Sequence, residues 1–181
     1  MTFKPNDPLL LVGKILVILG QALMALTVAA LLIALPVLWL NLGNIAAEIQ
    51  TEFPSAAAFP TGAISGGIAI ALIMAGLMFF FFRKIMHIIE TVGAGDPFAP
   101  ENANRLGAMA WAMLAVQLLA IPLGGLALYI AKIVDEYGEH ADITVDAGLD
   151  LSGIIMVVTL FILARVFRHG AAMRDDLEGT V

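Results

Sequence analysis

This chain of 181 residues contains no cysteine. Disulfide exchange, thiolate nucleophiles and cysteine-ligated metals are therefore excluded from its chemistry. A membrane thiol oxidoreductase built on four helices is ruled out by this absence alone.

Charge is also scarce. Only 13% of the residues are charged, 61% are hydrophobic, and the mean hydropathy is +0.97. A soluble domain of this size would be roughly half apolar, so the composition places the chain among membrane proteins. The loops are too short and too polar to form a second core, which predicts a single membrane domain over residues 1–181. No basic stripe suggests direct binding of nucleic acid.

Patterns that support catalysis or ion transport are missing as well. Transporters and proton pumps place ionisable groups at mid-membrane, whereas the deep polar residues here are the uncharged Gln21 and Gln117. The three histidines form no H-E-x-x-H motif, and no serine is paired with a histidine in a recognisable motif. We therefore expect no enzyme activity, no cofactor and no metal site.

Four long apolar runs divide the chain, and about 20 apolar residues suffice to cross a bilayer as a helix. They predict an all-α integral membrane four-helix bundle with helices at about 10–40, 62–92, 100–131 and 149–168. Outer loops are expected at 41–61 and 132–148, with Asn41-Leu42-Gly43-Asn44 ending the first helix. The apolar core of the fourth helix, Leu151 to Ala164, is short, and Arg165 would extend it by reaching the headgroups.

The basic residues predict the orientation. Eight of the nine fall where alternation across the membrane places the cytoplasm: Lys4, Lys14, Arg83, Lys84, Arg105, Arg165, Arg168 and Arg174. Only Lys132 falls outside. Positively charged segments resist translocation, so we expect a multipass inner-membrane protein with both termini in the cytoplasm.

Small residues recur at the spacing that lets helices approach closely in lipid, as in Gly62-x-x-x-Gly66 and Ala71-x-x-x-Ala75. The spacing favours packing within one bundle, and a homodimer remains the alternative.

The inner hairpin, residues 83–106, is the most specific part of the sequence. The second helix should run past the membrane to Val92, with Gly93 in a left-handed conformation behind it. Pro100 suits the first position of the third helix, and Glu101 suits its first turn. Asn102 would bond loop carbonyls, and Arg105 would pair with Glu101 or Glu90.

Two segments resemble a bacterial membrane family, domain of unknown function twenty-nine seventy-five. They are Gly95-Asp96-Pro97-Phe98 with Glu101-Asn102-Ala103-Asn104-Arg105-Leu106, and the tail from Leu163 to Gly170 and from Leu177 to Val181. The four-helix layout is similar too. The resemblance implies a multipass bacterial protein with no assigned activity, encoded beside small helix-turn-helix regulators. It supplies no catalytic residue.

Two functions follow as hypotheses. The first is a non-enzymatic protein that docks a cytoplasmic partner, such as a small helix-turn-helix regulator, through the hairpin and the tail. Its candidate docking or structural residues are Asp96, Pro97, Phe98, Glu101, Asn102, Arg105, Arg165 and Arg168. The alternative is a carrier of a small hydrophobic solute, bound within the bundle near Gln117 and Pro122.

Overall fold

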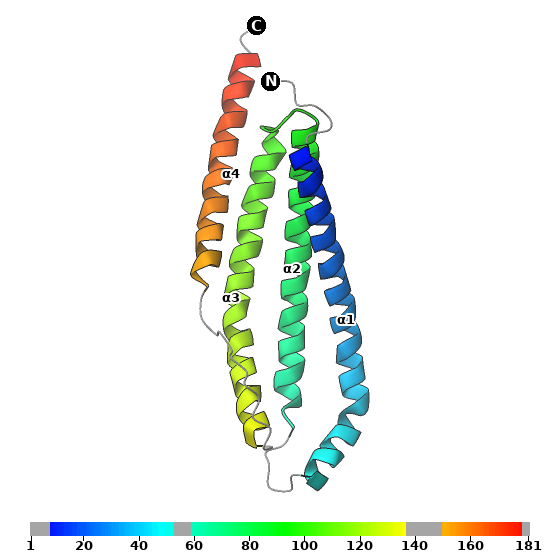
Figure 1. Cartoon of the computed structure of the whole chain (residues 1–181). Helices are drawn as coiled ribbons and strands as arrows, with labels where there is room; N and C mark the ends of the chain where they lie inside the picture. Colours follow the sequence, from blue (N-terminus) through cyan, green and yellow to red (C-terminus); the bar gives the residue numbers. More distant parts are fainter. Residues whose placement is uncertain (1–7, 53–58, 137–149, 179–181) are drawn as a thin grey trace.

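The computed structural model describes residues 8–52, 59–136 and 150–178, which form four α-helices (Figure 1). They are α1 (Pro8–Glu52), α2 (Thr61–Gly93), α3 (Pro100–Glu136) and α4 (Leu151–Glu178). All four are long and apolar enough to cross a membrane. The described residues contain no strand, so the all-α prediction is confirmed.

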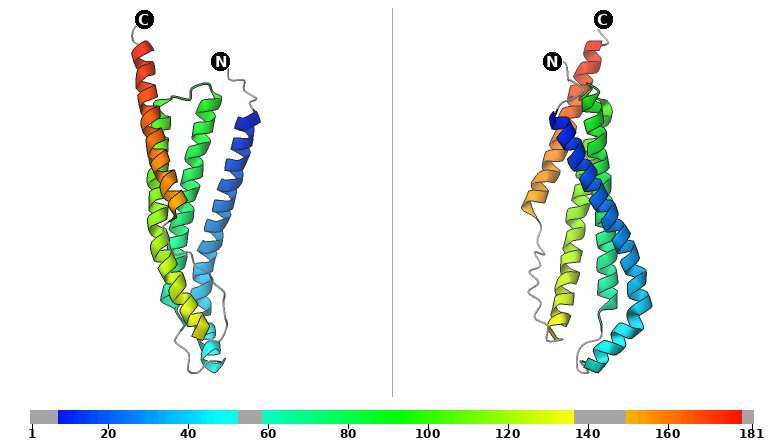
Figure 2. Two further views of the ribbon diagram at one scale, coloured as in Figure 1. Left: turned by 60° about the vertical axis from the view of Figure 1, so that its left-hand side comes forward. Right: turned by 45° about the vertical axis from the view of Figure 1, so that its right-hand side comes forward.

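The four helices form an open row. Each packs on its neighbour in the chain, α1 on α2, α2 on α3 and α3 on α4, and among the described residues no other pair of helices is in contact. Figure 2 shows the four helices from two further sides, and in its right-hand view α1 crosses α2. The predicted bundle is therefore not closed. In lipid there is no hydrophobic force to bring α1 against α4, since lipid tails cover an apolar helix face as well as another helix does.

Small residues set the distances between neighbouring helices. A Cβ atom at Gly20 of α1 would lie 2.8 Å from Cε1 of Phe82 in α2. Between α2 and α3, Gly66 faces Leu126 and Gly67 faces Leu123. Large side chains thus fit into notches left by glycine, which is how helices pack in lipid.

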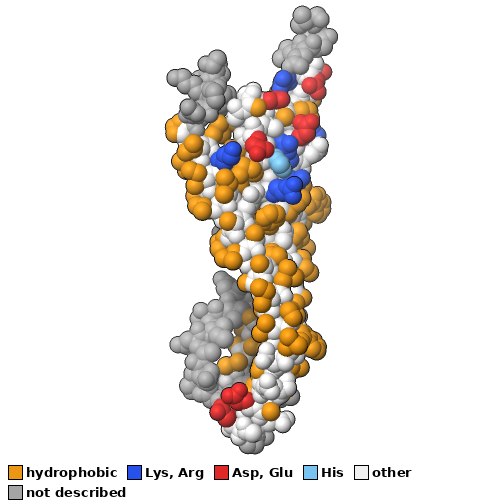
Figure 3. Space-filling view, turned by 90° about the vertical axis from the view of Figure 1, so that its right-hand side faces the viewer, with side chains coloured by type: hydrophobic (Ala, Val, Ile, Leu, Met, Phe, Trp, Pro, Cys, Tyr) orange, Lys and Arg blue, Asp and Glu red, His pale blue; other side chains and the backbone are white. Residues whose placement is uncertain are grey.

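These helix contacts also place the basic side chains of neighbouring helices at the same level along the row. Gly13, next to Lys14, lies against Ile89, and the Arg105 guanidinium reaches the carbonyl of His87. Lysines and arginines consequently gather near the end where the α2–α3 loop lies, as Figure 3 shows. We call this the hairpin end and the opposite one the distal end. The start of α1 and the last turn of α4 also lie at the hairpin end (Figure 1).

An apolar band lies between the two ends. Orange side chains cover this stretch in Figure 3. Along α2 the band runs from Thr61 to Arg83, a rise of about 33 Å at 1.5 Å per residue. That length matches the hydrocarbon core of a bilayer, about 30 Å.

Helix α1 is longer than the sequence predicts. It does not stop at about residue 40 but continues to Glu52, so residues 41–52 are helix rather than loop. Asn41, expected to help end the helix, donates from Nδ2 to the carbonyl of Val37 at 2.8 Å and so stays within it. Figure 1 shows the last, cyan part of α1 bending back toward the side where α2 begins.

Helix α4 is displaced toward the hairpin end, relative to α3. It begins at Leu151, near the predicted start, but extends to Glu178 instead of about 168. Asp150 caps it, because its two carboxylate oxygens accept the backbone N–H groups of Ser152 and Gly153, each at 3.0 Å. Its first turn lies against Gln117, midway along α3, and its last turns pass the α2–α3 loop (Figure 1).

The predicted outer loop at 132–148 begins too early, because α3 continues to Glu136. The rest of that loop, from 137 onward, lies outside the described residues.

Candidate functional site: the polar lock of the hairpin

The hairpin is built around Asn102, whose side chain is completely buried. Its Nδ2 donates to Oγ1 of Thr91 at 2.8 Å and to the carbonyl oxygen of Pro97 at 3.0 Å. One amide therefore joins the end of α2, the loop and the first turn of α3. We call the set Thr91, Pro97, Asn102 and Arg105 the polar lock.

Arg105 completes the polar lock. Its Nη1 donates to Oδ1 of Asn102 at 2.7 Å and to the backbone carbonyl of His87 at 3.1 Å. The predicted ion pair with Glu101 or Glu90 is wrong, because Arg105 turns toward α2 and Glu90 lies beside His87 at 3.2 Å. Bonds to a charged donor are about twice as strong as neutral ones, so this contact fixes how Asn102 is oriented.

Thr91 has a double role in the polar lock. Its hydroxyl accepts from Asn102 and is placed to donate to the carbonyl of Ile88 at 2.9 Å. Sequence reasoning did not single out this residue. A threonine in the last turn of a helix commonly bonds back to that turn, so no local signal distinguished it.

The chain reverses through one glycine. The N–H of Asp96 bonds to the carbonyl of Thr91, and that of Gly95 to the carbonyl of Val92, each at 3.0 Å. Gly95 has φ +88°, which a side chain would oppose. Gly93, expected in that conformation, is instead the last residue of α2. The helix start is as predicted, with Pro100 first and Glu101 in the first turn.

Phe98 connects the loop to α4. Its ring lies 5.5 Å from that of Phe167, measured between centroids. It also covers Gly170 so closely that a Cβ there would come within 2.8 Å of the ring. The ring is nevertheless 43% exposed, so one face remains accessible.

A second link joins the loop to the tail of α4. Nη1 of Arg174 contacts Oδ1 of Asp96 at 2.5 Å, and both side chains are about half exposed. Sequence reasoning selected Asp96 but not Arg174. The two are far apart in the chain, and only the register of α4 on α3 brings them together.

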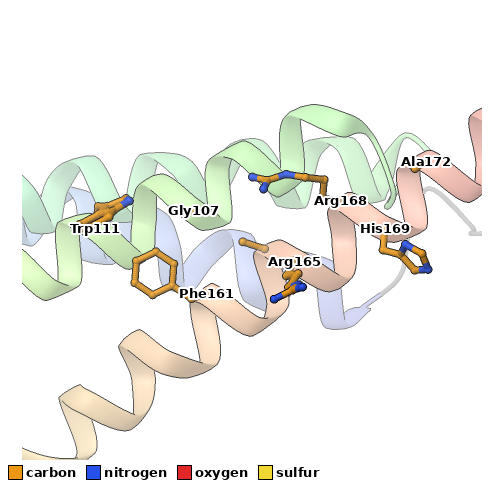
Figure 4. A pocket seen from close by; sticks show the side chains of 8 residues that line it. Gly107, Trp111, Phe161, Arg165, Arg168, His169 and Ala172 are labelled. Carbon is orange, nitrogen blue, oxygen red and sulfur yellow. The ribbon is translucent and has the colours of Figure 1, made fainter.

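The remaining candidates lie outside the polar lock. Glu101 is exposed on the first turn of α3. Arg165 and Arg168 line a cleft between α3 and α4, with Trp111, Phe161 and His169 (Figure 4). Within the described part of the chain, no group of three or more His, Asp or Glu side chains could hold a metal ion.

Four long apolar helices, with a belt of basic side chains at one edge of their apolar band, define a helical multipass membrane protein. The chain belongs to the family described as "Protein of unknown function (DUF2975)", which matches residues 44–181. Neither the curated proteins nor the solved structures contain a match. The family resemblance of the hairpin and tail is thereby confirmed, but the match leaves out most of α1.

Proposed function

We propose that this is a non-enzymatic protein of the bacterial inner membrane that docks a cytoplasmic partner at its hairpin end. The basic residues support this orientation, since they gather at that end, and both α1 and α4 have their outermost turns there.

The polar lock is the observation that carries the proposal. Asn102 and Arg105 make their hydrogen bonds within the hairpin and hold its two helices in one arrangement. Asp96 and Phe98 then fix α4 to the loop. A preorganised end favours tight binding, because little conformational freedom is lost on association.

An apolar groove lies on this rigid end. Phe98, Val166 and Met173 line it with Ile162 and Gly170, Arg165 and His169 lie at it as well, and its volume is about 540 Å³. Met173 is 52% exposed, although it follows Arg165 and Arg168 toward the end of α4, where water is expected. Exposed apolar groups in such a place indicate a protein contact.

The proposed partner is a small helix-turn-helix regulator. On the first turn of α3 and the last turns of α4 the acidic side chains of Glu101 and Asp175 are exposed. A DNA-binding protein has a basic face, so these acids complement it and would compete with DNA for it. The partner would thus be held at the membrane, away from its operator.

The open row gives no support to the alternative, a solute carrier. Since α1 and α4 do not touch, the four helices do not surround a central space in which a solute would lie. We therefore favour docking.

Co-purification from detergent tests the proposal. We expect the regulator to accompany the intact protein and to be lost when Phe98 and Met173 are both replaced by serine. The matched control replaces Leu40 and Trp39, exposed near the distal end, with serine. A regulator that never co-purifies, and whose location in the cell is unchanged by deleting the gene, would show the proposal to be wrong.

A further inference from the structure

The cleft between α3 and α4 adjoins the docking groove, with which it shares Arg165 and His169. Its volume is about 760 Å³. Trp111 and Phe161 form its apolar part, and Arg165, Arg168 and His169 form its basic part. Figure 4 shows the two aromatic rings together at one end of the cleft and the basic side chains at the other.

The two parts lie at different depths. Trp111 and Phe161 contact each other edge to face, with ring centroids 5.4 Å apart, and Trp111 is 65% exposed. About one and two turns further along α4, Arg165 and Arg168 belong to the basic residues at the hairpin end. The cleft thus crosses the border between the apolar band and the basic belt.

Within the described part of the chain, no carboxylate neutralises Arg165 or Arg168. Among the described residues, neither guanidinium lies within ion-pair distance of a carboxylate, in contrast to Arg174 with Asp96. Arginine is well suited to phosphate, because its planar group can donate two parallel hydrogen bonds to two oxygens.

We propose that this cleft binds an anionic phospholipid, with the phosphate between Arg165 and Arg168 and the acyl chains beside Trp111 and Phe161. A phospholipid can interact with both parts of the cleft at once, through its acyl chains and its phosphate, whereas a free phosphate can interact only with the basic part. The position of the cleft at the edge of the band fits where phospholipid headgroups lie. The proposal does not depend on which side of the membrane the hairpin end faces.

Trp111 provides the readout. With Trp39→Phe, it becomes the only tryptophan, since the chain has two. Its fluorescence would be quenched by bromine-labelled phosphatidylglycerol or phosphatidylcholine in mixed vesicles. We expect phosphatidylglycerol to bind more tightly, by about fivefold for each arginine, given about 1 kcal/mol per basic residue near an anionic surface.

Two variants, each with a control, distinguish lipid binding in the cleft from attraction by the general surface charge. Arg165→Gln with Arg168→Gln should remove the preference for phosphatidylglycerol, whereas Arg83→Gln, in the same belt but not in the cleft, should leave it. Gly107→Leu keeps every charge but fills the cleft, and no atom lies within 4 Å of the added Cβ. It should also remove the preference, whereas Gly125→Leu, equally free of neighbours, should not.

Three results would overturn the proposal. One is equal quenching by the two lipids, and another is an equal loss of preference in Arg83→Gln. The third is release of the preference by millimolar glycerol 3-phosphate, which would assign the cleft to soluble phosphates. Gel filtration and circular dichroism of each variant confirm that the fold is retained.

Discussion

Nδ2 of the buried Asn102 donates to Oγ1 of Thr91 at 2.8 Å, across the two helices of the hairpin. The same amide accepts from Arg105 through Oδ1 at 2.7 Å. The most specific sequence motif of the chain therefore serves first to fix the shape of its hairpin end.

Asn102→Ala should be strongly destabilising. It removes the acceptor of Arg105 and the donor to Thr91 and Pro97. Since a buried polar group left unpaired costs about 1–3 kcal/mol, we expect the free energy of unfolding to fall by about 2–4 kcal/mol. Thermal unfolding in detergent measures it. Asn104→Ala, two residues away and exposed, is the control. Equal effects of the two substitutions would mean that the polar lock contributes nothing.

Gly153→Ala should loosen the start of α4. The new Cβ would overlap Gln117, whose Nε2 lies 1.2 Å from that position, and Gln117 is only 7% exposed. We expect a cost of about 1–3 kcal/mol, as for other overpacked sites. The double variant with Gln117→Ala should recover most of it, because residues in contact are coupled. Additive effects in unfolding measurements would contradict the contact.

Arg174→Gln should free the tail with little effect on global stability. Exposed ion pairs contribute about 0–1 kcal/mol, and this pair is half exposed. Amide hydrogen exchange in the last turns of α4 should nevertheless become faster, because the substitution removes the ion pair that joins Arg174 to Asp96 of the loop. Arg168→Gln, on the same helix but without that contact, should leave those rates unchanged. Unchanged exchange in Arg174→Gln would show that the pair does not hold the tail.

The absence of cysteine makes the orientation directly measurable. Single substitutions Glu48→Cys at the distal end and Glu101→Cys at the hairpin end place one thiol on each side, and both sites are exposed. A membrane-impermeant maleimide added to intact spheroplasts should label the first variant and reach the second only after lysis. The reverse pattern would place the hairpin end outside and exclude a cytoplasmic partner.

Much of the fold follows from local signals. The apolar runs predict all four helices, and Pro100 with Glu101 predicts where α3 begins. Local signals fail to predict features that depend on contacts between residues far apart in the chain. Asn41 and Gly43 are typical of a helix end, yet α1 continues through them. The open row cannot be foreseen either, because each apolar helix would fit a closed bundle equally well.

The same division holds for the site. Asn102 stands out in the sequence because it belongs to a family-like motif, but its partner Thr91 does not. Pairing of Arg105 with a nearby acid is the natural local guess. The structure instead gives it the carbonyl of His87, which lies across the hairpin on α2, and Oδ1 of Asn102, which precedes it on α3.

Photo-crosslinking in living cells tests the central claim, that the hairpin end docks a cytoplasmic partner, most directly. A photoreactive residue replacing Glu101 lies on the hairpin, and one replacing Glu48 lies at the distal end as the control. The account predicts that the first captures a helix-turn-helix regulator and the second does not, and that Phe98→Ser with Met173→Ser abolishes capture. Capture of no regulator from Glu101, or equal capture from both positions, would contradict it.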